Sequence, residues 1–164
     1  MPTPHETPQG RLTTAESARA YVLADADRDS EKWTRKSLTL RSIASGVRFT
    51  YRVARPAGTG ADRPWLVSIL TGPDNQNDYV YLGLLRPRQD GVILQHTAKS
   101  GLPRSAAAWK AWDYFTRQVL QGGRMPNALE VWHEGRCGRC GRKLTTPESV
   151  ARGLGPECAS RVGG

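Results

Sequence analysis

The stretch LTLRSIASGVRFTYRV (residues 38–53) contains two runs in which apolar and polar side chains alternate. The apolar members of the two runs are Leu38, Leu40, Phe49, Tyr51 and Val53. Alternation with a period of two is typical of strands that are buried on one face only. Between the runs, Ala44-Ser45-Gly46 supplies the small residues of a turn. The stretch therefore predicts a β-hairpin.

Two further segments extend this pattern along the chain. Residues 65–70 form a short apolar run, and residues 79–85 form another after the turn residues Gly72-Pro73-Asp74-Asn75. Clusters of Gly, Pro, Asp and Asn favour tight turns between strands. Residues 92–97 would add a third pass to the meander. We therefore expect an antiparallel sheet of about five strands.

Two helices are predicted beside this sheet. Thr13 and Glu16 have the spacing of a capping box, which would open a helix running to about Asp25. Ser105 can cap a second helix, and Gly122-Gly123 would end it. The expected fold class is α+β, with a domain over residues 13–127 and a disordered start over residues 1–12.

The second helix carries a stripe of large apolar side chains at helical spacing. Its members are Trp109, Trp112, Phe115 and Val119. Such a stripe usually docks a helix against a sheet, although exposed aromatics could also stack on bases. We favour the core interpretation. His96, at the end of a predicted strand, has no partner identifiable from the sequence and is interpreted as an ordinary residue.

The C-terminal segment, residues 128–164, contains all the cysteines of the chain. Cys137 and Cys140 form a C-x-x-C pair, and 17 residues separate Cys140 from Cys158. This spacing indicates a zinc module, and His133, at the end of a predicted strand, is the nearest candidate for the fourth ligand. An acidic residue or water could take the fourth position instead. The alternative, a redox pair, would normally lie in a βαβ unit, which this segment lacks.

The run CGRCGRKLTTPESVARGLGPEC (residues 137–158) resembles a small zinc-ribbon-like, treble-clef domain of unassigned function found in phage, plasmid and actinobacterial proteins. That family reads approximately C-x-x-C-G-x-x-L-T-x-P-x-S-x-x-x-G-x-G-P-x-C. The resemblance covers about the last thirty residues and implies a metal-binding accessory module of a mobile-element protein, without a known activity. No characterised family is recognised in the larger N-terminal part.

The chain carries 24 Lys and Arg against 15 Asp and Glu, a net charge of +9. Basic residues are concentrated in residues 28–64 and around the cysteines, where they could form one positive surface for phosphates. The predicted nucleic-acid contacts are Arg35, Lys36, Arg41, Arg48, Arg52, Arg136, Arg139, Arg142 and Lys143. A charged alternation on a strand is also the ordinary composition of a solvated sheet face.

No nucleotide-binding, nucleophile or metalloprotease motif occurs in the sequence, so we expect no catalytic activity. Cysteines at metal spacing and the absence of a long apolar run favour a cytoplasmic protein without a membrane partner. The expected function is a zinc-binding, nucleic-acid-associated protein of a mobile element. The alternative is a protein-interaction module that inhibits a host nucleic-acid-handling or defence complex through an acidic partner.

Overall fold

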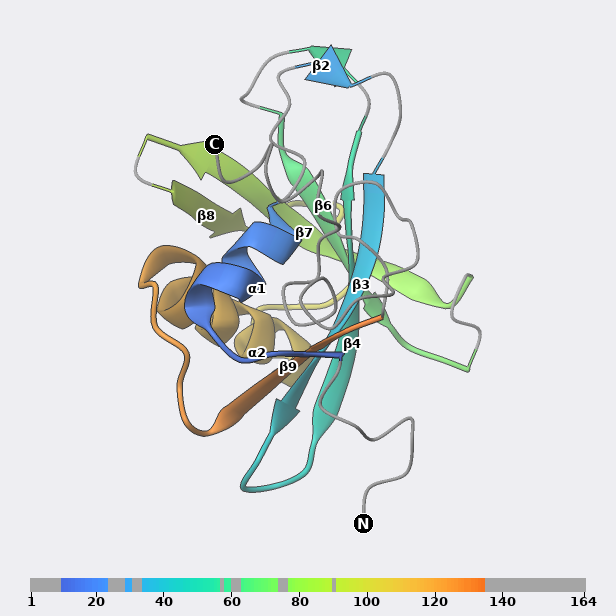
Figure 1. The fold of residues 1–164 in the computed structure, drawn as a ribbon. Helices are drawn as coiled ribbons and strands as arrows, with labels where there is room; N and C mark the ends of the chain where they lie inside the picture. The colour runs from blue at the N-terminus through green and yellow to red at the C-terminus, as the bar shows by residue number, and fades with distance from the viewer. Residues whose placement is uncertain are drawn as a thin grey trace.

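A computed structural model describes residues 10–23, 29–30, 34–56, 58–59, 63–73, 77–89 and 91–134. Its main element is a seven-stranded sheet in the order β1-β9-β3-β4-β6-β7-β8, with every neighbouring pair antiparallel (Figure 1). The strands are β1 (Arg11–Leu12), β3 (Thr34–Ser42), β4 (Arg48–Arg55), β6 (Trp65–Leu70), β7 (Tyr79–Arg88), β8 (Gly91–Gln95) and β9 (Leu129–His133). A small second sheet pairs β2 (Asp29–Ser30) with β5 (Gly58–Thr59).

The predicted hairpin is confirmed. Leu38 lies opposite Tyr51 and Leu40 lies opposite Phe49, so the apolar side chains of β3 and β4 share one face. The returning strands β6, β7 and β8 continue the meander as expected. The strand predicted to end at His133 is confirmed as β9, and it inserts between β1 and β3. Strand β1 was not predicted, because residues 1–12 were expected to be disordered. Strand β9 is thus an inner strand of the same sheet as β3 and β4.

The first helix, α1 (Ala15–Val22), begins one residue later than predicted. Its cap is Thr14, whose side-chain oxygen accepts a 3.0 Å hydrogen bond from the Ser17 amide. The Ser17 hydroxyl in turn accepts from the Thr14 amide at 3.4 Å, which completes a capping box. The box of Thr13 with Glu16 is therefore wrong. Burial determines at which residue the helix begins, because the buried side chains must all face the sheet. These are Ala15, Ala18, Tyr21 and Val22. The predicted helix end at Asp25 lies outside the described residues.

The second helix is α2 (Ala107–Phe115), continued by a π-helical turn, η3 (Thr116–Gln121). Its cap is Ala106, which makes no side-chain hydrogen bond, so the prediction of a Ser105 cap is wrong. The Ala106 amide instead closes a turn by donating to the Pro103 carbonyl at 3.0 Å. The predicted end is confirmed, because Gly123 adopts a φ of 64°, a left-handed conformation that suits glycine.

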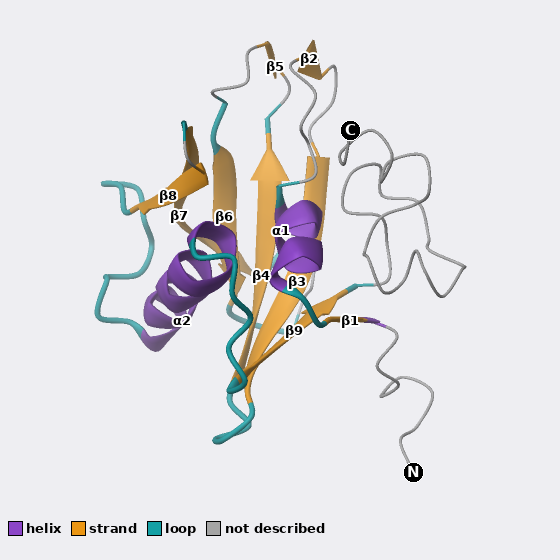
Figure 2. Cartoon of the chain, turned by 60° about the vertical axis from the view of Figure 1, so that its left-hand side comes forward, coloured by secondary structure: helices purple, strands orange, loops and turns teal. Residues whose placement is uncertain are grey.

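Both helices pack against the same face of the sheet (Figure 2). The core interpretation of the aromatic stripe is confirmed, since Trp112, Phe115 and Val119 are fully buried. The ring of Trp112 lies 4.7 Å from that of Tyr51, which joins α2 to β4. No described helix covers the opposite face of the sheet. In the described part of the chain, no helix is long and apolar enough to cross a membrane.

Candidate nucleic-acid interface

The sheet face opposite the helices, here called the open face, gathers arginines and aromatic side chains. Alternation along each strand places its members on this side, and every one is exposed or half-exposed. The open face comprises Arg35, Ser37, Thr39, Arg41, Arg48, Thr50, Arg52, Tyr79, Tyr81 and Trp132. Four of the arginines predicted from the sequence are thus brought together. The three aromatic residues were not predicted to join them.

A depression of about 310 Å³ lies at the centre of the open face. Three neighbouring strands form its floor, because Thr39 of β3 pairs with Thr50 of β4 on one side and with Trp132 of β9 on the other. The two threonine hydroxyls are 2.7 Å apart and hydrogen-bonded, which holds the strands in register there. Other described residues that line the depression are Ser37, Leu38, Leu70, His133 and Glu134. The depression combines one large aromatic side chain with small hydroxyl groups.

Arg52 lies beside this depression, since it pairs in register with Ser37. Its guanidinium sits over the ring of Tyr79, 4.2 Å from the ring centroid. Stacking on the ring in this way fixes the plane of the guanidinium. Arg52 and Tyr79 therefore form one ordered basic and aromatic unit on the open face.

Arg41 is on the open face but is already bound to a carboxylate. Its guanidinium makes an ion pair with Glu130, and Arg11 lies 3.8 Å from the other oxygen of the same carboxylate. Glu130 is only 8% exposed, so two cations share one nearly buried anion. The positive charge that Arg41 offers to a ligand is correspondingly reduced. Arg35 and Arg48 are exposed.

Lys36 is on the other side of the sheet from these arginines. It is 1% exposed and points toward α1, because strand alternation gives it the same face as Leu38 and Leu40. Its assignment to a surface stripe is therefore corrected, and Lys36 does not belong to the open face. Arg136, Arg139, Arg142 and Lys143 lie outside the described residues.

His133 occupies the last position of β9 on the helix side of the sheet. It is 8% exposed, and its ring centroid is 5.4 Å from that of Tyr21. Leu129 and Val131 share this buried side. Cys137, Cys140 and Cys158 lie outside the described residues, and among the residues that are described no three His, Cys, Asp or Glu side chains gather as metal ligands.

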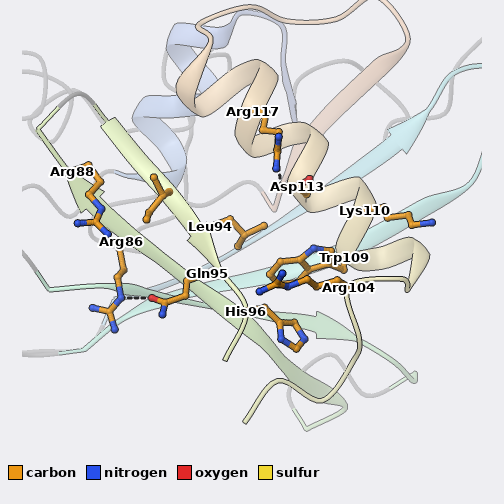
Figure 3. A pocket seen from close by; sticks show the side chains of 11 residues that line it. Arg86, Arg88, Leu94, Gln95, His96, Arg104, Trp109, Lys110, Asp113 and Arg117 are labelled. Atoms are coloured by element: carbon orange, nitrogen blue, oxygen red, sulfur yellow. Dashed lines mark hydrogen bonds and ion pairs between the residues drawn. The ribbon is translucent and has the colours of Figure 1, made fainter. Parts of the chain in front are cut away.

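The structure also reveals a second basic surface, at the far edge of the sheet. A trough of about 900 Å³ runs between the β7–β8 hairpin and helix α2 (Figure 3). Its described lining comprises Arg86, Arg88, Ile93, Leu94, Gln95, His96, Arg104, Trp109, Lys110, Asp113 and Arg117. Five cations thus face one carboxylate. Sequence reasoning missed this surface, because its residues come from four separate segments.

The cations of the trough differ in their partners. Arg117 makes an ion pair with Asp113 at 3.1 Å, and Arg86 donates to the side-chain oxygen of Gln95. Arg88, Arg104 and Lys110 are exposed, and no described carboxylate pairs with them. The trough therefore keeps a net positive charge.

His96 has a structural role at one end of the trough, consistent with its interpretation as an ordinary residue. A ring nitrogen, Nε2, lies 2.8 Å from the Leu102 carbonyl oxygen, at hydrogen-bonding distance. Its ring meets that of Trp109 edge to face at 5.0 Å. These contacts attach the loop after β8 to helix α2.

The fold and these two surfaces define a basic α+β protein with one helix-covered and one open sheet face. A family of unknown function (DUF6011) matches residues 128–163. The match agrees with the resemblance over residues 137–158 to a C-terminal domain of unassigned function, and it also includes β9. No curated protein and no solved structure matches the chain.

Proposed function

We propose that the open face binds single-stranded nucleic acid and that the protein acts as a non-catalytic binding protein. One observation carries this proposal: exposed or half-exposed arginines and aromatic rings share the sheet face that no described helix covers, around a depression. Arg48 and Arg52 supply cations, while Tyr79 and Trp132 supply ring surfaces. Binding of unpaired strands by other proteins combines these two elements, a basic surface for the backbone and rings on which bases stack.

The strandedness follows from the shape of the surface. Bases within a duplex are stacked on each other and do not expose their faces to a protein side chain. Trp132 lies in a sheet, not on a projecting helix that could enter a groove. Unpaired bases can approach such a flat surface, with phosphates directed to the arginines at its sides.

A zinc-binding module at the C-terminus is part of the proposal. Cys137, Cys140, Cys158 and His133 form a Cys₃His set, which suits structural Zn²⁺ because it leaves no position open for chemistry. In the sequence, Arg136 follows Glu134, which lines the depression, by two residues. Zinc bound by His133 would fix the basic residues around the cysteines near the end of β9. His133 supports this assignment through its position at the end of β9, next to the cysteine-containing segment.

Fluorescence anisotropy tests the proposal with labelled twelve-nucleotide DNA and RNA, each single-stranded and duplex. Single strands should bind more tightly than duplexes, and the logarithm of affinity should fall linearly with the logarithm of salt concentration, by roughly 0.7 per phosphate contact. Trp132→Leu should weaken binding by about 1–3 kcal/mol, the range for one stacked base. Tyr114→Leu, which removes an exposed aromatic from α2, is the matched control. Absence of binding to all four probes at low salt would refute the proposal.

A further inference from the structure

Strand β8 forms one edge of the seven-stranded sheet in the described part of the chain. Its register with β7 places Val92 opposite Pro87. Proline has no amide hydrogen, so this pair is of the type that exchanges no hydrogen bonds. Val92 and, two residues on, Leu94 therefore direct their backbone groups away from β7 and toward the open edge.

Part of this edge is already occupied by a side chain. The Gln121 amide nitrogen donates to the Val92 carbonyl oxygen at 2.8 Å, in the way that the backbone of an added strand would. Gln121 belongs to η3, which packs beside this end of β8. Among the described residues, no side chain caps the Leu94 backbone in the same way. The backbone groups of Leu94, which lines the trough, are thus available to pair with an added strand.

The trough presents cations on both sides of this position. Arg86 and Arg88 come from β7 on one side, and Lys110 and Arg117 come from the α2–η3 helix on the other (Figure 3). Arg104 adds a charge at the Trp109 end. A ligand along the β8 edge would therefore meet positive charge on both flanks, which favours an anionic ligand.

The described lining of the trough offers no exposed aromatic surface of the kind that unpaired bases need. Trp109 is only 7% exposed and packs in a T-shaped arrangement with the His96 ring. Its neighbours Ile93 and Leu94 are half-buried aliphatic side chains. Backbone hydrogen-bonding groups, aliphatic contacts and flanking cations suit an extended acidic peptide better than a nucleic acid.

We propose that the trough binds an acidic, extended segment of a partner protein, which pairs with the β8 edge at Leu94 and places carboxylates beside Arg88, Arg104 and Lys110. The pairing is short, because η3 occupies the edge at Val92. Much of the affinity therefore comes from the charges. This site is independent of the open face and does not rest on the nucleic-acid proposal.

The probe is a fluorescein-labelled eight-residue peptide of alternating Glu and Val, added to the full-length protein at low salt. Binding measured by anisotropy should weaken roughly tenfold or more in the double variant Arg104→Glu/Lys110→Glu. The double variant Arg48→Glu/Arg52→Glu has the same charge change on the open face and should bind the peptide unchanged. A peptide methylated at alternate backbone nitrogens keeps its charge but cannot donate to β8, so it should bind the wild-type protein more weakly.

Two results would overturn the proposal. If the methylated peptide binds as tightly as the parent, no strand pairing occurs at β8. If Arg104→Glu/Lys110→Glu weakens oligothymidine binding more than Arg48→Glu/Arg52→Glu does, the trough belongs to nucleic acid. Loss of oligothymidine binding on the open-face variant alone, with peptide binding intact, would support both sites separately.

Discussion

The ammonium group of Lys36 donates a 2.8 Å hydrogen bond to the carbonyl oxygen of Tyr21 and a 3.1 Å bond to that of Val22. These carbonyls belong to the last turn of α1, where no further helical amide can reach them. A cation there is also favourably placed against the helix dipole. A lysine near the start of β3 thus satisfies the end of a helix and joins α1 to the sheet.

Lys36→Met should destabilise the protein by roughly 1–3 kcal/mol, because two buried carbonyl oxygens lose a charged donor. Chemical denaturation of the variant and wild type measures the change. Lys110→Met, at an exposed position of α2, is the control and should shift stability by less than about 0.5 kcal/mol. Oligonucleotide binding of folded Lys36→Met should stay unchanged. A reduced salt dependence in that variant would contradict the structural role assigned to Lys36.

Arg48→Ala/Arg52→Ala should lower the salt dependence of single-stranded DNA binding. Each phosphate contact contributes about 0.7 to the slope, so the loss of two contacts should reduce it by about 1.4. Arg104→Ala/Lys110→Ala removes the same charge from the trough and serves as the control. Equal slopes for the two double variants would show that binding follows net charge and not the open face.

Protein purified without added zinc should contain about one equivalent of the metal. Cys158→Ser should release it more readily than His133→Ala, because a thiolate contributes more than an imidazole to a soft site. Metal analysis after dialysis against a chelator measures retention. His133 also packs against Tyr21, so a loss of stability alone does not show ligation. Full zinc retention in His133→Ala would place the fourth ligand elsewhere.

Because of Tyr51, the free energy of unfolding should fall at high pH. The Tyr51 hydroxyl donates to the Ala108 carbonyl at 2.6 Å, and burial raises the pKa of this phenol far above its usual value near 10. Below about pH 10 both the folded and the unfolded chain hold the proton, so its contribution to stability is complete there. Above that pH only the unfolded chain releases it, which costs roughly 1.4 kcal/mol of stability per pH unit.

Tyr51→Phe tests this linkage by denaturation at pH 7 and pH 11. At pH 7 the variant should be less stable by about 1 kcal/mol, the usual net value of one hydrogen bond. At pH 11 the difference should vanish or reverse, because phenylalanine has no proton to lose. A constant difference between the two pH values would contradict the linkage.

The sequence by itself determined the local elements of this protein. Period-two alternation at residues 38–53 specified a hairpin, and the spacing of Trp109, Trp112 and Phe115 specified the buried face of α2. These features are readable because strand and helix geometry repeat over a few residues. Alternation also predicted that Arg48 and Arg52 share a face, which the register confirms.

Tertiary structure decided which distant residues meet. Only the position of β9 between β1 and β3 brings Trp132 beside Thr39 and Glu130 beside Arg41. The packing of α1 brings two buried carbonyl oxygens to Lys36. The trough depends on bringing β7, β8 and α2 together across a sheet edge. Such contacts depend on the long-range order of the strands and the docking of the helices, which no local period encodes.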